Sequence, residues 1–152
     1  MTGIIIRRAE PADAPVLNAI VQGSSAYDGV YRAMIDDYEI LTAQIVRDEV
    51  HLAEDESDVL GFYGLVLAPE PELDLLFVSD VAQGRGVGRV LLDHMRALAA
   101  ARSFNTVKIV AHPPAAEFYR RMGAVDVGLV YPMGRVTWVR PIFMLPVSPL
   151  SA

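Results

Sequence analysis

The chain contains no cysteine. Disulfides, thiolate nucleophiles and cysteine-ligated metals are therefore excluded, and the redox compartment is left open. Positive charge is also scarce, with 13 Lys and Arg against 19 Asp and Glu and a formal net charge of −6. We expect no nucleic-acid partner and no membrane partner, because both call for a basic face.

Long apolar runs are missing as well, and no stretch approaches the length of a membrane span. Arg7 and Arg8 follow the short apolar run 4–6, whereas a signal peptide would place its charges first. We therefore expect a cytoplasmic protein. The histidines form no i, i+4 pair and no carboxylate cluster, so we expect no metal. A length of 152 residues predicts one domain spanning residues 1–152.

Apolar periodicity alternates between the strand and helix patterns along the chain, which predicts one mixed α/β (α+β) domain. Short links favour antiparallel neighbours among the strands. Residues 24–37 have no clear assignment, and Pro132, Gly134 and Pro141 favour a loop over a long hairpin after the sixth strand. We expect strands at 4–7, 51–53, 59–67, 73–78, 106–111, 124–130 and 142–145, and helices beginning at Pro11 and at 40–46, 89–102 and 113–122.

The most informative segment is 75–88, followed by the apolar-periodic run 89–102. It predicts a strand, a glycine-rich loop and a helix N-terminus in series. Such a loop aims unpaired backbone N–H groups and the positive end of the helix dipole at one point, which suits a phosphate or pyrophosphate. The alternate glycines remove Cβ atoms from this loop, and Arg85 and Arg89 add positive charge.

Two common phosphate loops do not match this segment. The third glycine comes one position early for a dinucleotide fingerprint, and the Gly-Lys-Ser/Thr of a P-loop is missing. What remains is Q-x-x-G-x-G, which resembles the acyl-coenzyme-A pyrophosphate loop of the GNAT superfamily of N-acetyltransferases. The residues that carry this resemblance are Gln83, Gly84, Arg85, Gly86, Val87 and Gly88.

A second segment, 115–124, resembles the A-x-x-F-Y-x-x-x-G-[FA] helix of the same superfamily. On periodicity alone it is equally a core-facing helix that Gly123 terminates. Its distance from the glycine loop, with a strand between the two, favours the GNAT interpretation. The two motifs span residues 73–125, and the order of strands and helices extends the likeness over nearly the whole chain.

The resemblance implies a GNAT fold: a mixed, mostly antiparallel, twisted sheet of about 6–7 strands, with helices on both faces and a V-shaped acyl-CoA cleft. It implies acetyl-CoA as acyl donor co-substrate and transfer of an acetyl group to a primary amine, which we expect to belong to a small molecule. A longer acyl group stays open. So do two other classes, a non-catalytic acyl-CoA-binding regulatory module and a nucleotide-binding module of another fold.

The resemblance also implies roles for individual residues. A free amine must lose a proton before it attacks a thioester, and the departing thiolate must gain one. Tyr119 matches the family's acid, and Glu72 occupies the position of a catalytic glutamate in some members. Asp74 would share the strand face of Glu72, and a water relay without an essential carboxylate stays open. The cofactor-binding residues implied are Phe77, Val78, Gln83, Gly84, Arg85, Gly86, Val87, Gly88, Arg89, His112, Ala116 and Phe118, with a backbone N–H near Val78 facing the carbonyl oxygen.

Three further polar residues receive non-catalytic interpretations. His112 stands where many members carry asparagine or serine, and we assign it no catalytic role. Asp80 is interpreted as a turn residue, and His94 as a packed, hydrogen-bonded histidine.

The identity of the acceptor is the property that the sequence constrains least. Tyr27 and Tyr31 lie where the superfamily roofs its acceptor pocket, so they and Asp74 are candidate substrate residues; core packing explains the tyrosines equally well. The acidic composition slightly favours a cationic amine over an acidic acceptor. Residues 131–140, which hold the only tryptophan, Trp138, either cover the acceptor or join a partner in a homodimer.

Overall fold

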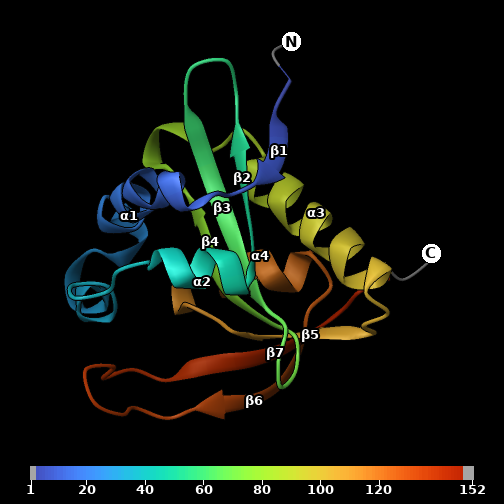
Figure 1. The fold of residues 1–152 in the computed structure, drawn as a ribbon. Helices are drawn as coiled ribbons and strands as arrows, with labels where there is room; N and C mark the ends of the chain where they lie inside the picture. The colour runs from blue at the N-terminus through green and yellow to red at the C-terminus, as the bar shows by residue number, and fades with distance from the viewer. Residues whose placement is uncertain (1–2, 149–152) are drawn as a thin grey trace.

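Residues 3–148 form a seven-stranded sheet of order β1-β2-β3-β4-β5-β7-β6 in a computed structural model (Figure 1). Neighbouring strands are antiparallel except β4 and β5, which are parallel. The predicted mixed, mostly antiparallel sheet is therefore confirmed; residues 1–2 and 149–152 of the expected domain lie outside the described range. The strands are β1 (Ile5–Arg8), β2 (Glu49–Glu54), β3 (Val59–Val66), β4 (Glu72–Val78), β5 (Thr106–Val110), β6 (Val125–Val130) and β7 (Arg140–Pro146).

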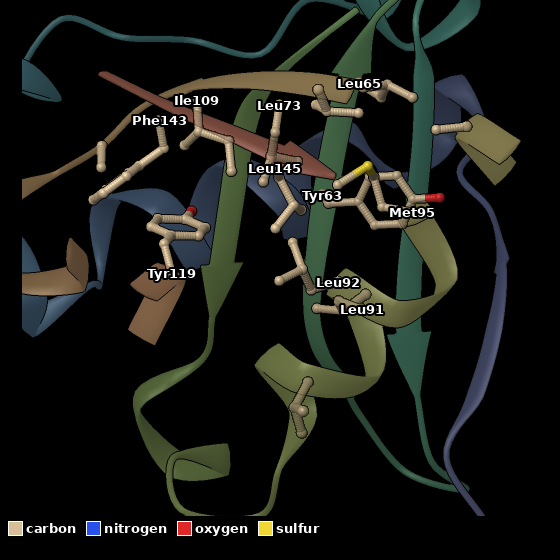
Figure 2. Packing of buried hydrophobic residues seen from close by; sticks show 14 of the residues in the cluster. Tyr63, Leu65, Leu73, Leu91, Leu92, Met95, Ile109, Tyr119, Phe143 and Leu145 are labelled. Atoms are coloured by element: carbon tan, nitrogen blue, oxygen red, sulfur yellow. The ribbon is translucent and has the colours of Figure 1, made fainter. Parts of the chain in front are cut away.

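Helices cover both faces of the sheet, as expected. On one face, α1 (Ala14–Gln22) and α2 (Thr42–Arg47) bury an apolar stripe that includes Leu17, Val21 and Ile45. On the other face lie α3 (Val87–Ala101) and α4 (Ala116–Arg121). Figure 2 shows the α3 side chains Leu91, Leu92 and Met95 against Tyr63 and Leu65 of β3. Burial of these apolar faces is the main force that holds the two layers together.

The unassigned segment 24–37 forms two short 3-10 helices, η2 (Ser25–Tyr27) and η3 (Gly29–Met34). The side-chain amide of Gln22 donates to the carbonyls of Ile35 and Tyr38, which ties the far end of the segment back to α1. Gly29 adopts a left-handed φ of 74° between the two 3-10 helices. Apolar periodicity cannot reveal such a segment, because polar bonds across ten or more residues hold it.

The chain between β6 and β7 was expected to be a loop and not part of a long hairpin: residues 131–139 form no helix or strand, but they join two strands that pair as a hairpin. β6 pairs with β7 from Val125↔Met144 to Val130↔Arg140, and Met133 and Val136 form a further antiparallel bridge. The two strands therefore continue outward as a long hairpin (Figure 1). Gly134, with φ of 58°, supplies the left-handed residue that a tight hairpin turn requires. We call residues 131–139 the β6–β7 connection.

The sheet is nearly split in its middle. The parallel strands β4 and β5 pair only at Glu72↔Lys108, where the Lys108 N–H donates to the Pro71 carbonyl at 3.0 Å. Beyond that point the ladder ends, so the carboxyl halves of β4 and β5 bound an open V. The expected V-shaped cleft therefore lies between residues 73–78 and 109–112.

A β-bulge lies in β4, two residues after the single β4–β5 pair. Leu65 pairs with Leu73 and Gly64 with Leu75, so Asp74 is the extra residue. Leu73 and Leu75 consequently pack into the cores on opposite faces of the sheet, although they are two residues apart. Regular alternation breaks between Asp74 and Leu75, after both carboxylates, so the expectation that Glu72 and Asp74 share a strand face stays a prediction.

No helix among residues 3–148 has the length and apolar character needed to cross a bilayer.

Candidate active site

The glycine loop leaves β4 through a 3-10 turn, η4 (Asp80–Ala82), and enters α3 at Val87. Within the described chain, the backbone N–H groups of residues 84–89 have no hydrogen-bond acceptor, and the first helical bond is Val90 N–H to the Gly86 carbonyl at 3.1 Å. Gly84 and Gly86 have φ of 81° and 77°, and a Cβ at either position would meet no atom within 4 Å. The loop is therefore an open cradle of donors at a helix N-terminus, which fits a pyrophosphate.

Side chains around the cradle differ in whether they already have a polar partner among the described residues. Gln83 turns inward, and its amide donates to the Val78 carbonyl at 3.0 Å. Arg85 lies 3.5 Å from Asp55, so part of its charge is already matched. Arg89, in the first turn of α3, forms neither a hydrogen bond nor an ion pair with the described residues and stays exposed. Gly88 packs at ordinary contact distance beside Phe118 and Val78.

A groove of about 1050 Å³ continues from the cradle between α3 and α4. Arg121, like Arg89, makes no polar contact within residues 3–148, and the guanidinium of Arg96 donates to the Pro146 carbonyl at 3.1 Å. Arg96 and Arg121 were not predicted as site residues, because nothing local distinguishes them from other surface arginines. The groove is lined by Arg89, Asp93, Arg96, Ala97, Ala100, Phe118, Arg121, Met122, Val147 and Ser148.

The backbone of Val78 faces the V. Ser79 N–H donates to the Leu60 carbonyl at 2.8 Å, which makes Leu60 and Ser79 a hydrogen-bonded pair of the β3–β4 ladder. The next pair, Gly61↔Val78, is then the non-hydrogen-bonded kind, whose N–H and C=O point away from the partner strand. The N–H of Val78 therefore points toward β5, at a level where the two parallel strands no longer pair.

Tyr119 of α4 is buried, with 6% of its surface exposed, and its ring lies beside Phe143 and Ile109 (Figure 2). Its hydroxyl makes no hydrogen bond with residues 3–148 and is not a fully enclosed atom. Burial raises the pKa of Tyr119 far above its usual value, and the neighbouring Tyr27 adds to the rise. The hydroxyl is therefore protonated at neutral pH and can act as a proton donor.

The open end of the V carries a chain of aromatic contacts. Tyr27 stacks on His112 with ring centroids 3.8 Å apart and on Phe77 at 5.4 Å. Tyr31 meets His112 edge-on at 4.7 Å and Trp138 edge-on at 4.9 Å. The candidate residues Tyr27, Tyr31, Phe77 and His112 are thus brought together, and Trp138 of the β6–β7 connection joins them.

His112 has a defined hydrogen bond at this end of the site. Its Nε2–H donates to the Ala26 carbonyl at 2.6 Å, which fixes the tautomer of the neutral ring. Burial lowers the pKa of His112, with the bond to Ala26 opposing that change, so the ring is neutral at pH 7. Burial also raises the pKa of Tyr27 to about 12.

The candidate bases lie at the closed end of the V. Glu72 occupies the single β4–β5 pair opposite Lys108. Asp74 sits in the bulge, where loss of hydration and the negative charge of Asp48 raise its pKa, while Arg47 opposes the rise. Asp74 lies in the V-forming part of β4, and its raised pKa makes it a stronger base than an ordinary aspartate.

Two other interpretations can be compared with the structure. His94 accepts or donates a 2.8 Å bond with the Tyr63 hydroxyl and is partly buried, which confirms it as a packed, hydrogen-bonded histidine. Asp80 begins the η4 turn and also accepts bonds from the N–H and hydroxyl of Ser25, at 3.2 and 3.1 Å. It therefore links the glycine loop to η2, a contact across 55 residues that the sequence could not indicate.

His, Asp and Glu side chains within residues 3–148 form no group of three that could ligate a metal.

An open V beside a donor-rich helix N-terminus, in a sheet of this order, defines an acyl-CoA-dependent acetyltransferase fold. Residues 47–123 match the family model of the acetyltransferase (GNAT) domain. The chain therefore belongs to the GNAT superfamily and is an acetyl-CoA-dependent N-acetyltransferase, as the two motifs predicted.

Individual relatives agree with this assignment. The 5-NmdU N-acetyltransferase of Pseudomonas phage PaMx11 is 28% identical over 129 residues, covering 82% of this chain and 89% of that protein. The PaiA N-acetyltransferase of Thermoplasma acidophilum, solved with coenzyme A, superposes with a TM-score of 0.73 at 18% identity, over 95% of this chain and 99% of that one. The ribosomal-protein-S18-alanine N-acetyltransferase of Escherichia coli superposes with a TM-score of 0.72 at 20% identity, covering 96% and 95%.

Proposed function

We propose that this N-acetyltransferase acts on a primary amine of a small molecule. The observation that carries the proposal is the closure at the acceptor end, where η3 and the β6–β7 connection meet. Tyr31 contacts Trp138, and Arg135 lies 2.6 Å from Asp37. A polypeptide acceptor would need an open groove at that point, whereas a small amine fits beneath the two segments.

Acetyl-CoA, the donor, supplies an activated acetyl thioester. In our proposal its pyrophosphate is held by the backbone N–H groups of residues 84–89 together with Arg89. The free edge of β4 would receive the pantetheine arm through main-chain bonds, in the manner of an added strand. Arg85 contributes less than expected because Asp55 already neutralises part of its charge. The side chains proposed to line this path are Phe77, Val78, His112, Ala116 and Phe118.

Three groups of this chain would carry the chemistry. Glu72, or Asp74 beside it, takes the proton from the amine, directly or through water. The Val78 N–H donates to the carbonyl oxygen as negative charge develops there. Tyr119, protonated at neutral pH because burial raises its pKa, donates to the departing sulfur.

The acceptor named for the phage relative, 5-NmdU, is a reasonable first compound to assay. At 28% identity the pocket is free to differ, so simple primary amines belong in the same panel. The homodimer considered from the sequence also stays a prediction. Its natural test is light scattering with variants of β6, where Val125, Val127 and Leu129 are 55%, 56% and 51% exposed.

The experiment that tests the donor site is calorimetric titration with acetyl-CoA of the wild type and of Gly86→Glu. A carboxylate in the cradle repels the pyrophosphate, so we expect binding to fall by about 100-fold or more. Gly134→Glu is the matched control, because Gly134 also has a left-handed φ, 58°, and open space around it. Equal loss of affinity in both variants, or retained affinity in Gly86→Glu, would contradict the proposal.

A further inference from the structure

Arg140, the first residue of β7, has no partner for its charge. Its side chain forms neither a hydrogen bond nor an ion pair with any residue in the range 3–148. Its Nε is enclosed without an acceptor, while its terminal nitrogens are not among the enclosed atoms. Arg135, in the preceding connection, is by contrast paired with Asp37. In a chain of net charge −6, an unmatched and partly enclosed guanidinium is unusual.

Trp138, two residues earlier, presents a second unpaired donor. Its indole Nε1–H is enclosed and has no acceptor in the described chain. A buried donor without a partner destabilises the protein that contains it. Neither enclosed N–H can be reached from outside, so the terminal nitrogens of Arg140 are the donors left for a group supplied from outside the chain.

Both residues lie at the open end of the V. β5 and β7 pair as far as Val110↔Ile142, and Ala111 N–H donates to the Pro141 carbonyl at 2.9 Å. One further step in that register places Arg140 opposite His112. The positive charge of Arg140 also acts on Tyr27, whose ring stacks on His112. Trp138 reaches the same group of rings through Tyr31.

We propose that the guanidinium of Arg140 binds an anionic oxygen group, a carboxylate or a phosphate, on the amine acceptor. This rests on the proposed function, whose acceptor end Arg140 adjoins. A guanidinium presents a planar fork of donors that matches such a group. Overall charge slightly favoured a cationic acceptor, whereas the acceptor proposed here carries an anion in addition to its amine.

The single tryptophan makes the proposal directly measurable, because the indole fluorescence of the protein comes from Trp138 alone. We would titrate the protein, with and without coenzyme A, with 2-phenylethylamine, 4-(2-aminoethyl)benzoate and tyramine O-phosphate. These amines share an aromatic ring and differ in carrying no anion, a carboxylate or a phosphate. We expect at least one of the two amines that carry an anion to bind about tenfold more tightly than 2-phenylethylamine.

The same titration with Arg140→Met identifies the group responsible. We expect the preference for the anionic amine to disappear in Arg140→Met, to persist in part in Arg140→Lys and to be retained in Arg135→Gln. Equal affinity for the three amines, or an undiminished preference in Arg140→Met, would overturn the proposal. The tighter anionic amine shows whether the group recognised is a carboxylate or a phosphate.

Turnover gives a second, independent test through the ratio of kcat/KM for the amines with and without an anion, read by thiol release. We expect this ratio to fall by several-fold in Arg140→Met and to be retained in Trp138→Phe, which keeps an aromatic ring and removes only an enclosed N–H. An unchanged ratio in Arg140→Met would contradict the proposal. Absence of acetyl-CoA binding in calorimetry would instead refute the donor site, and the fluorescence titration without coenzyme A would still decide the present inference.

Discussion

The donor-binding end and the acceptor-binding end of the site are built in different ways. The donor end is formed by consecutive backbone N–H groups, residues 84–89, which short-range sequence leaves unpaired. The acceptor end is formed by side chains from three distant segments, represented by Tyr27, His112 and Trp138. The backbone cradle binds acetyl-CoA, which all family members share, whereas single substitutions can change the side chains of the acceptor site. Substitutions at one end should therefore alter one substrate and leave the other unaffected.

Tyr119 is the proposed proton donor, and its loss should give the largest effect. We expect Tyr119→Phe to lower kcat by about 10²–10⁴-fold, because the departing sulfur loses its proton donor. The KM for acetyl-CoA should change little, since the ring stays in place. Steady-state kinetics with thiol detection measure both quantities.

The matched control is Tyr63→Phe. It removes another buried hydroxyl, which bonds His94 at 2.8 Å on the far side of α3. We expect a lower Tm and a normal kcat. If Tyr63→Phe lowered kcat as much as Tyr119→Phe does, the loss would reflect packing rather than proton transfer.

The bases can be separated by comparing Glu72→Gln with Asp74→Asn across pH. The variant of the true base should lose about 10²-fold or more in kcat/KM, together with the acid limb of the pH profile. If Asp74 is the base, that limb lies above the ordinary pKa of about 3.9 for aspartate, because the native environment raises the pKa of Asp74. Retention of the full profile in both variants would favour a water relay.

Asp74 also makes a prediction about stability. A raised native pKa means that the folded protein binds this proton more tightly than the unfolded chain does. The ionised carboxylate therefore destabilises the fold at pH 7, and the penalty disappears as the pH falls below the native pKa. We expect Asp74→Asn to have a higher Tm than wild type at pH 7, with the difference vanishing near pH 3.

Arg121→Gln tests the donor site, and we expect a smaller effect than from loss of the base. Loss of one unpaired cation from the groove should weaken acetyl-CoA binding by about tenfold and leave the acceptor KM unchanged. Arg120→Gln is the neighbouring control, because Arg120 is already paired with Glu117 and Asp126 outside the groove. Equal acetyl-CoA affinities of the two variants, measured by calorimetry, would show that the groove takes no part in donor binding.

The smallest effect expected is that of Arg135→Gln, which removes an ion pair whose side chains are 57% and 74% exposed. Exposed pairs contribute at most about 1 kcal/mol, so the Tm should barely move. Any kinetic change should appear in the acceptor KM and not in acetyl-CoA affinity. A change in acetyl-CoA affinity would show that the two ends are coupled.

The sequence predicted most of what depends on local pattern. The strand, glycine loop and helix at 75–101, the helix ended by Gly123 and the mostly antiparallel sheet all follow from periodicity and backbone chemistry. The β4 bulge escaped prediction because alternation assumes a regular strand, and the bulge is fixed by pairing with β3. The β6–β7 hairpin was missed because its prolines and glycine read as breaks, although they stand at its turn and its strand end.

The parts of the site that could be predicted are likewise those that depend on local sequence pattern. The donor cradle could be located from six consecutive residues, and Tyr119 from the motif that contains it. Arg121 and Arg140 were not singled out, because their significance lies in the partners that they lack, and those are known only once the chain is folded. The aromatic contacts of the site join residues 50 to 107 positions apart, and no local pattern encodes such pairings.

The single rung between β4 and β5 has a thermodynamic consequence. The four strands before it and the three after it share almost no backbone hydrogen bonds, so side chains alone join the two halves of the sheet on the open side. In our proposal the pantetheine arm of acetyl-CoA lies in that gap and pairs with the free edge of β4, as a further strand would. Saturation with acetyl-CoA should therefore raise the Tm as mass action requires and slow amide exchange along β4, most strongly at Val78, in protein otherwise unchanged.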